Sequence, residues 1–354
     1  MKLTVNRALL LVLGVAYIAI GLIRRSFYSD GLVDWKTVAI LSSLIVVNTG
    51  LMYSDGLSFI SYKIIHVTKD RRQLVILSII LTAFLAMFLT NDVSLLILIP
   101  ITVSIGKFTG KNSDDIIIFQ AIAANVGSML TPFGNPQNII IFRTMNLNSS
   151  EFIYAMLPIF LSSMVILLLF TFIFRNEKIT PSGEIPKPNF PFFYTNLLLL
   201  SVALAGILAN ASIFIFIVII VLSFISFAVF EPRAIIKVDY VLIVVFILIF
   251  LVMNSLRFFV KIPTGGGTVE IFFLSLILSQ FISNVPTTVL FGKVVNWTAL
   301  TYGVDIGGNG TIIASLANII ALRNISGRNF MKFNKYSFLF LVITAIIGLI
   351  ILLR

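Results

Sequence analysis

Long apolar runs, separated by short polar stretches, make up most of this chain. A helix needs about 20 apolar residues to cross the roughly 30 Å hydrocarbon core of a bilayer, and Met156–Phe174 comes close to that length. The first run is followed by Arg24 and Arg25 rather than by a small-residue cleavage site, so we expect it to be a membrane span. The runs fall at about 8–23, 36–53, 73–89, 93–106, 114–142, 151–174, 194–209, 212–230, 238–255, 268–282, 285–297, 300–322 and 336–353. This pattern predicts an all-α polytopic membrane protein.

The composition supports the same fold class. Of the 354 residues, 59% are hydrophobic and only 11% are charged, whereas about a quarter of the residues are charged in soluble domains. One aqueous core cannot bury so many apolar side chains. Lipid is therefore expected to be the solvent for much of the surface.

Polar residues interrupt two of the apolar stretches. The first interruption is Thr90, Asn91 and Asp92, and the second is Ser283 and Asn284, with Thr287 close behind. The apolar arms that follow have about 14 residues, or about 21 Å as helix, which is too short for a full crossing. The pattern predicts two re-entrant hairpins with polar tips. The alternative is a pair of ordinary turns between full crossings, because Asn, Asp, Ser and Pro all favour turns.

Each predicted hairpin is followed by a segment that glycine, asparagine or proline breaks. These segments are Ala121–Phe142, which contains GNPQN, and Tyr302–Arg323, which contains GGNGT. Non-helical backbone at membrane depth is tolerated only where protein or a cavity lines it. Two such breaks, each after a polar hairpin, are typical of an inverted-repeat transporter.

The charge distribution predicts the orientation of the chain. The net charge is +11, and with each hairpin returning to its own side, most of the 25 Lys and Arg residues fall on the side of the N-terminus. Basic loops are typical of the cytoplasmic side, so we expect a multi-pass plasma-membrane protein with a cytoplasmic N-terminus and no role in nucleic-acid binding. The resulting architecture has about nine crossings plus two hairpins. Its divisions are a first inverted repeat at 1–174, a cytoplasmic linker at 175–193, a linking helix at 194–211 and a second inverted repeat at 212–354.

Oxygen-rich side chains at the tips and breaks are the candidate binding groups. Oxygen ligands suit a hard cation such as Na⁺, and helix N-termini suit an anion. The predicted substrate or ion ligands are Thr90, Asn91, Asp92, Gly134, Asn135, Asn138, Ser283, Asn284, Thr287, Gly308, Asn309 and Thr311. Those suited to Na⁺ are Asn91, Asp92, Asn135, Asn284 and Asn309. The substrate is a small molecule or ion, and Na⁺ as coupling ion is the one cofactor considered.

Asp92 is the predicted coupling residue, because an ionisable side chain inside a membrane segment is costly without a function. Glu270 and Asp305 are also candidates, but both lie near predicted segment ends, so a solvated acid at the membrane interface is an equally good interpretation. Asn125 and Asn318 are expected to form hydrogen bonds between helices rather than to touch substrate. No Lys or Arg is predicted at the site.

Several other classes of function are disfavoured. Cysteine is absent and His66 is the single histidine, so thiolate sites and the paired histidines of a zinc protease are excluded. His66 also lies in a basic loop away from any membrane serine, and Asp92 and Asp305 match no protease motif. We predict no catalytic residues and no enzyme. An ion channel is a further alternative, which single-channel recording would distinguish from a carrier.

At these motifs the chain resembles the ion transporter superfamily. The branch concerned contains citrate-transporter-like permeases, divalent anion:sodium symporters, arsenite permeases and one class of sodium/proton antiporters. The resemblance covers nearly the whole chain, through FLTNDVSLLILIP and QFISNVPTTVLF at the hairpins and ANVGSMLTPFGNPQNIIIF and DIGGNGTIIASLANIIALR at the breaks.

The resemblance implies a transporter for a small anion, such as a di- or tricarboxylate, coupled to Na⁺ or H⁺ and working by alternating access. It also implies a homodimer with an elevator-like movement. The sodium-coupled dicarboxylate members carry Ser-Asn-Thr at each tip, and here Asn91, Ser283 and Asn284 match it. Thr90 and Asp92 depart from it in the direction of arsenite permeases and sodium/proton antiporters, while GNPQN is closer to citrate-like permeases. Arsenite efflux and sodium/proton exchange therefore remain alternative functions.

Overall fold

The computed structural model describes residues 1–354 except 1, 25–26, 28–30, 110–111, 175 and 179–183. Apart from one isolated bridge between Asp70 and Lys178, the described residues form helices and loops. The helices are α1 Lys2–Arg24, α2 Trp35–Tyr53, α3 Gly56–Ile65, α4 Arg71–Phe88, α5 Asn91–Thr109, α6 Asp114–Ser128, α7 Pro136–Thr144, α8 Ser149–Phe170, α9 Phe190–Leu208, α10 Ile213–Phe230, α11 Tyr240–Leu256, α12 Thr268–Ile282, α13 Asn284–Phe291, α14 Trp297–Gly307, α15 Leu316–Leu322 and α16 Phe330–Leu352. Short 3₁₀ turns lie at Thr171–Ile173, Pro232–Lys237 and Gly327–Asn329.

The predicted all-α polytopic class is confirmed. In the described part of the chain, seven helices are long and apolar enough to cross a membrane, namely α2, α4, α8 with the turn after it, α9, α10, α11 with the turn before it, and α16. Large apolar side chains such as Phe214 and Val229 are exposed on α10, as expected of a helix that faces lipid.

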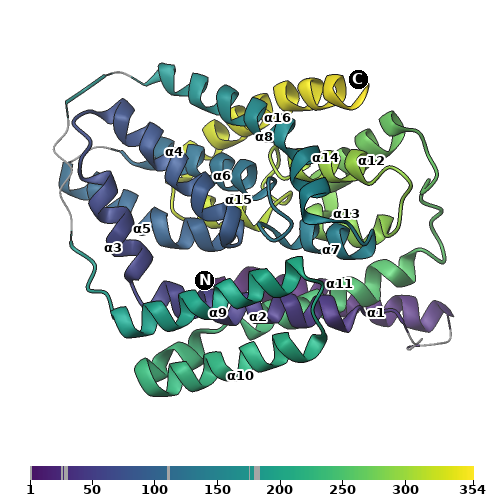
Figure 1. The fold of residues 1–354 in the computed structure, drawn as a ribbon. Coiled ribbons are helices and arrows are strands. Elements are labelled where there is room, and N and C mark those ends of the chain that lie inside the picture. Colours follow the sequence, from purple (N-terminus) through teal and green to yellow (C-terminus); the bar gives the residue numbers. More distant parts are fainter. Residues whose placement is uncertain (1, 25–26, 28–30, 110–111, 175, 179–183) are drawn as a thin grey trace.

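The helices form two groups (Figure 1). Helices α1, α2, α9, α10 and α11 pack on one another along the lower half of the view. The hairpins, the broken helices, α8 and α16 form the second group above them. Contacts of α11 with α13 and of α2 with α5 and α7 join the two groups. We call the lower group the scaffold and the upper group the hairpin layer.

The two halves of the chain run in opposite directions across the layers. Lys36 lies in the first turn of α2, and its Nζ donates to the carbonyl oxygen of Asn210, 3.0 Å away and just before α10. The second half therefore starts on the face where α1 ends. With the same helix order repeated after α9, this is the inverted arrangement that the sequence predicts. The exact division into repeats, linker and linking helix remains a prediction, although α9 begins at Phe190, a few residues earlier than expected.

The predicted hairpins are α4–α5 and α12–α13. In Figure 1 the first lies toward the left and the second toward the right, so the two approach the middle from opposite ends. The second arm of the first hairpin is longer than predicted, because α5 starts at the tip residue Asn91 and continues to Thr109. Arm length is thus a weak argument for a re-entrant first hairpin. The contacts of its tip, described below, are the stronger one.

Each broken helix packs closely on the first arm of its own hairpin. Gly127 on α6 faces the backbone of Ala83 on α4, and Gly307 on α14 faces Leu276 and Ser279 on α12. An added Cβ would collide with Ala83, and at Gly307 it would come within 2.9 Å of the Ser279 Cβ. Glycine at both positions lets the helices approach this closely and holds each break against its hairpin.

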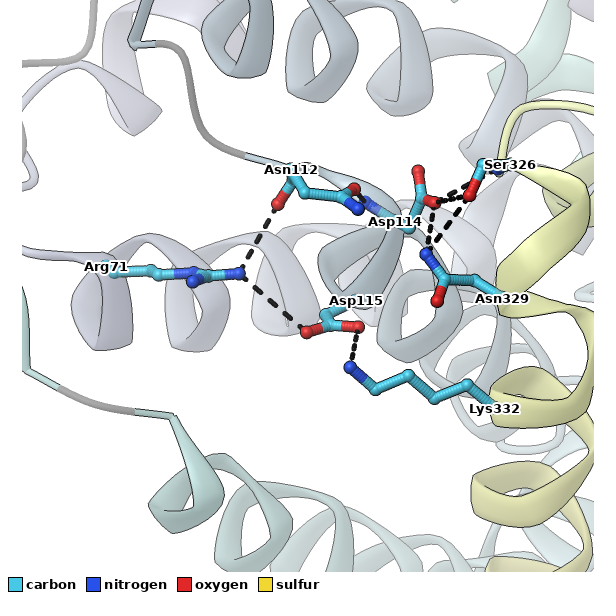
Figure 2. A network of polar contacts seen from close by, with 7 residues as sticks. All are labelled: Arg71, Asn112, Asp114, Asp115, Ser326, Asn329 and Lys332. Atoms are coloured by element: carbon cyan, nitrogen blue, oxygen red, sulfur yellow. Dashed lines mark hydrogen bonds and ion pairs between the residues drawn. The ribbon is translucent and has the colours of Figure 1, made fainter.

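A polar network joins the two halves at one end of the hairpin layer (Figure 2). Asp114, the first residue of α6, accepts hydrogen bonds from the Ser326 backbone N–H at 3.0 Å, the Ser326 hydroxyl at 2.7 Å and the Asn329 amide at 2.6 Å. Its neighbour Asp115 pairs with Lys332 at 2.6 Å. The start of α6 is thereby tied to the start of α16.

Candidate functional site

Each hairpin tip is hydrogen-bonded to the break of its own half. The Asn91 backbone N–H donates to the carbonyl oxygen of Gly134 at 3.1 Å, and the Asn284 backbone N–H donates to that of Ala314 at 3.1 Å. Ser283 adds a hydroxyl bond to Ala314, also at 3.1 Å. Freed carbonyls at each break therefore meet the first N–H of each second hairpin arm. The predicted juxtaposition of tips and breaks is present.

Capping side chains stabilise the non-helical backbone of the breaks. Asn135 is the N-cap of α7 and accepts a hydrogen bond from the Asn138 N–H at 2.8 Å, and Ser315 caps α15 in the same way. The Asn138 amide donates back across the first break to the carbonyls of Ser128 and Thr131, at 3.3 and 3.2 Å. Without these donors, the broken backbone would leave buried carbonyls unpaired, which is costly.

The second break repeats this pattern. The Asn318 amide donates to the carbonyls of Gly308 and Thr311, both at 2.9 Å. Each of these positions in the first break has a counterpart in the second at one constant interval along the chain. The pairs are Ser128 and Gly308, Thr131 and Thr311, Asn135 and Ser315, and Asn138 and Asn318. The two breaks are therefore structurally equivalent sites, and the same interval pairs Asn125 with Asp305.

The two breaks are also joined crosswise. Asn125, just before the first break, donates to the carbonyl of Gly308 at 3.1 Å and to the Asn318 side-chain oxygen at 3.0 Å, both at the second break. Asp305, just before the second break, accepts from Asn135 at 3.1 Å and from Gln137 at 3.0 Å, both at the first break. Each half thus completes the polar lining of the other.

Asn91 connects all these parts. Besides its backbone bond to the first break, its side-chain amide donates to Asn125 at 3.1 Å and to Ser315 at 3.3 Å. Its oxygen accepts from the Asp92 N–H at 3.0 Å. The Asn284 side-chain oxygen accepts from Val285 at 2.9 Å in the equivalent way. A Cβ added at Gly308 would lie 3.4 Å from the Asn284 amide nitrogen, so the second tip also reaches this centre.

Several buried polar atoms of this cluster have no hydrogen-bond partner among the described residues. They are the second oxygen of Asp305, the side-chain oxygen of Asn138 and the side-chain nitrogen of Asn309. Asp305 is only 2% exposed, and Asn138 and Asn309 are fully buried. Nearly all buried polar groups in folded proteins are paired, so these atoms, at the first break and at the second, are free to form hydrogen bonds with a bound ligand or water.

Other predicted ligands are used differently. The Thr287 hydroxyl donates to the Ser283 carbonyl within its own helix, and the Thr311 hydroxyl donates to the Gln280 carbonyl on α12. Both bonds hold a tip or a break in place. Thr90 is buried in the loop between α4 and α5.

Asp92 faces the scaffold. It lines a cavity of about 40 Å³ together with Thr90, Asn48 on α2 and Lys237 and Asp239 at the start of α11. The predicted absence of Lys and Arg from the site therefore applies to the crossed hydrogen-bond cluster but not to the surroundings of Asp92. The interpretation of Asp305 as a solvated acid at the membrane interface is wrong, because that carboxylate is buried at the centre. Glu270 is exposed, as expected of an interfacial acid.

Sequence reasoning missed the central role of three side chains, which are Asp305, Gln137 and Ser315. The interhelical bonding predicted for Asn125 and Asn318 is confirmed. The signal that could have identified Asp305 is the constant interval between the two breaks. Aligning DIGGNGTIIASLAN with NVGSMLTPFGNPQN places Asp305 directly on Asn125.

The fold and this site define a class: a polytopic membrane transport protein whose central polar site is built from interrupted helices. The chain belongs to the citrate transporter family, whose model matches residues 4–301. It is a transporter and not an enzyme, and the superfamily resemblance is confirmed.

Three relatives illustrate this membership. The chain is 36% identical to an uncharacterized transporter of Methanocaldococcus jannaschii, over 84% of this chain and 82% of that protein. It is 30% identical to the inner membrane protein YbiR of Escherichia coli K12, over 90% of this chain and 88% of that protein. A putative transporter arsB of Dictyostelium discoideum is 26% identical over 39% of this chain and 25% of that protein.

Proposed function

We propose that this protein is a secondary active transporter of a small anion of the di- or tricarboxylate class, coupled to Na⁺ or H⁺ and working by alternating access. The observation that carries the proposal is the crosswise joining of two equivalent breaks at the hairpin tips. Such a site is fixed within one layer, so it can be exposed to either side in turn when that layer moves against the scaffold. We place the protein in the plasma membrane with its N-terminus in the cytoplasm.

The chemistry at the second break supports an anionic or strongly polar substrate. Asn309 offers a buried, unpaired N–H donor, and the neutral side chains of Asn125 and Asn284 surround Gly308. Helix α13 begins at the tip residue Asn284, so the positive end of its dipole lies at this centre. Hydrogen-bond donors without a fixed positive charge can hold a carboxylate strongly enough to bind it and weakly enough to release it.

The test is uptake by purified protein in proteoliposomes. Citrate, succinate, malate, phosphate, sulfate and arsenite would be offered in turn, with Na⁺ and pH gradients imposed separately. We expect gradient-driven accumulation of at least one di- or tricarboxylate. Unitary currents in single-channel recording, or no uptake of any carboxylate under either gradient, would contradict the proposal.

Asn91 and Asn284 provide the first site variants. Asn91→Ala removes three side-chain hydrogen bonds at the centre, and Asn284→Ala removes the side-chain oxygen that accepts from the Val285 N–H at the tip, so each should lower uptake at least about tenfold. The matched control is Asn189→Ala, which likewise removes a side-chain oxygen that accepts from a backbone N–H, here that of Phe192 at the start of scaffold helix α9. If both site variants transport at the rate of the control, the tips are simple turns.

Arsenite efflux is the second candidate function. The Asp92 side chain at the first tip and the partial similarity to a putative transporter arsB favour it. Uptake of arsenite into everted vesicles, with no transport of any carboxylate in the same panel, would establish this alternative.

A further inference from the structure

An arginine lies at the end of each broken helix. Arg143 is in the last turn of α7 and Arg323 directly follows α15, and the constant interval between the breaks also separates these two residues. Arg143 reaches the start of scaffold helix α2. Its Nε donates to the Thr37 hydroxyl at 2.8 Å, and its guanidinium pairs with Asp34 at 3.5 Å. This arginine therefore joins the hairpin layer to the scaffold.

Arg323 makes no equivalent contact. Its side chain takes part in none of the hydrogen bonds or ion pairs between described residues, and one of its guanidinium nitrogens is buried without a partner. Helix α7 packs against α2, whereas α15 packs against α5 and α6 of its own layer. Because a buried donor without an acceptor is costly, this nitrogen indicates that Arg323 has an acceptor in another arrangement of the layers.

The scaffold carries a matching acceptor on its other face. Asp34 caps α2 and Asp239 caps α11, each by accepting a hydrogen bond from the backbone N–H three residues further on. The end of α11 lies at the start of α2, where the Asn254 amide donates to the Leu32 carbonyl at 2.6 Å. The two helices are therefore antiparallel, and their aspartate caps lie on opposite faces.

Two cavities between the scaffold and the hairpin layer support this equivalence. One has a volume of about 470 Å³ and is lined by Asp34, and the other has about 40 Å³ and is lined by Asp239. Further scaffold positions line both cavities at the interval that separates these two aspartates. The pairs are Leu32 and Lys237, Phe250 and Ile45, Asn254 and Thr49, and Arg257 and Met52. The scaffold thus presents equivalent surfaces to the hairpin layer on both faces.

The hairpin layer meets these two surfaces at different heights. The larger cavity is lined by Thr144 at the end of α7 and by Gly292 and Lys293 after α13, which form one end of the layer. The smaller cavity is lined by Thr90 and Asp92 at the first tip, in the middle of the layer, and by no described residue of α15. The layer is therefore displaced along the scaffold, toward the face that holds Asp239.

We infer that Arg323 binds Asp239 when the hairpin layer is displaced toward the opposite face, as Arg143 binds Asp34 in this structure. Because the two halves are inverted copies, exchanging their roles brings the end of α15 to the surface around Asp239 and separates the end of α7 from Asp34. The unpaired nitrogen of Arg323 then gains an acceptor. Both arginines are positioning residues, because neither belongs to the crossed hydrogen-bond cluster.

This inference deepens the proposed function and rests on it in one respect, the movement of the hairpin layer during alternating access. It does not depend on which substrate is carried. The two arginine–aspartate contacts would hold the layer at the two ends of its movement, so each contact affects the population of one position and the rate of leaving it.

The test is chemical crosslinking, for which a chain without cysteine is well suited. Thr144→Cys with Leu32→Cys reports the position seen here, because both residues line the larger cavity. Their counterparts, Asn324→Cys with Lys237→Cys, report the inferred position. A flexible bifunctional maleimide is added to each purified double-cysteine protein in proteoliposomes, without substrate. We expect both pairs to crosslink, because a carrier without substrate visits both positions.

Removing a charge should shift the balance between the positions. Arg323→Gln or Asp239→Asn should lower crosslinking of the second cysteine pair about two- to fivefold, as expected for the loss of a partly exposed ion pair, and Arg323→Lys should largely keep it. Asparagine still caps a helix, so Asp239→Asn leaves α11 intact. Arg143→Gln should raise the same yield. Lys335→Gln, which removes an exposed cation on α16, is the control and should change neither yield.

The double variant Arg323→Gln with Asp239→Asn separates a direct pair from two independent roles. For a direct pair, the second substitution has no further effect on the yield. The inference is overturned if the two effects add, or if Arg323→Gln and Asp239→Asn crosslink like the wild type. If Arg323→Gln does not fold, Asp239→Asn and Arg143→Gln still decide the question, because opposite changes in yield support the inference and unchanged yields overturn it.

This inference and the proposed function can fail separately. If the flux panel shows no carboxylate transport but crosslinking depends on Arg323 and Asp239 as stated, the proposed substrate is wrong and the docking contact stands. If carboxylates are transported and the second cysteine pair never crosslinks, the docking contact is wrong and the proposed function stands.

Discussion

At the scale of single residues, the site depends on two glycines, Gly134 and Gly308, where there is no Cβ. Gly134 packs so closely on the backbone of Ser128 that a Cβ would collide with that carbonyl. At Gly308, the nearest atoms to an added Cβ are the Asp305 carbonyl at 3.2 Å and the Asn284 amide nitrogen at 3.4 Å. The two glycines therefore differ in their role. Gly134 permits the turn, and Gly308 leaves room beside the second tip.

This difference gives a paired prediction. Gly134→Ala forces the backbone of the first break apart and should destabilise the protein by about 1–3 kcal/mol, as overpacking of a core does. Gly308→Ala should fold with a melting temperature close to that of the wild type but raise the KM for substrate. Thermal melting and concentration-dependent uptake of both variants check this. Equal melting temperatures for the two variants would contradict it.

The sequence was most informative where a single physical requirement accounts for the residue type at a position. Asn and Gly at the breaks, and Asn at the tips, were predicted because unwound backbone in a membrane needs such residues. The bond of Asn91 to Ser315 and the bonds of Asp305 to the first break could not be predicted, because these partners lie in the opposite half of the chain. Asp305 looked like a segment end by hydropathy, since α14 stops two residues later at the break rather than at the membrane surface.

At the scale of secondary-structure elements, Arg257 joins the scaffold to the second hairpin. It lies at the C-terminal end of α11, and its guanidinium donates to the carbonyls of Leu290, at 2.9 Å, and Val289 in the last turn of α13. Gly292, with φ of +61°, leaves the space that this guanidinium occupies. A cation at a helix C-terminus also interacts favourably with the helix dipole. The contact holds the hairpin layer in the position seen here.

Arg257→Gln should therefore favour movement of the second hairpin. Hydrogen bonds from a charged donor contribute about 1.5–3 kcal/mol, so their loss should shift the balance between positions about tenfold or more. Because the chain has no cysteine, a Thr144→Cys reporter in the adjoining 470 Å³ cavity gives a clean labelling rate. We expect Arg257→Gln to change that rate strongly. Lys293→Gln, in the same cavity, is the charge-matched control, and equal rates in the two variants would refute a specific role for Arg257.

The boundaries of α3 and α5 show where the hydropathy pattern is not enough to predict a helix or its length. It placed both hairpins and both breaks, but it did not predict α3, a ten-residue helix between α2 and α4. It also underestimated α5, because the apolar run after the polar tip covers only 93–106, whereas the helix has 19 residues. Neither feature follows from apolar length alone, since α3 lies between two spans and α5 is buried against other helices rather than lipid.

At the scale of the whole molecule, the Asp114 network is the main polar connection between the halves outside the site (Figure 2). Asp114 is 7% exposed and has three hydrogen bonds to the second half. Asp115 is more exposed and relies on ion pairs with Lys332 and Arg71. Buried hydrogen bonds to a carboxylate are worth more than screened surface pairs.

Asp114→Ala should accordingly lower the melting temperature clearly, whereas Asp115→Ala should lower it little. Raising the salt concentration should reduce the small effect of Asp115→Ala further and leave that of Asp114→Ala largely unchanged. Thermal melting in detergent at low and high salt measures both. A larger loss in Asp115→Ala would show that the ion pairs, and not the buried carboxylate, join the halves at this end.

The chain passes between scaffold and hairpin layer in three places, which are the segment containing α3, the linker before α9 and residues 257–267 after α11. The last of these contains three consecutive glycines, Gly265, Gly266 and Gly267. The tips, the breaks and the crossed hydrogen bonds all belong to the hairpin layer. Movement of that layer relative to the scaffold would therefore leave the surroundings of a bound substrate unchanged. Making these three connecting segments more rigid, for instance with proline in the glycine run, would lower the transport rate while leaving the affinity for substrate unchanged.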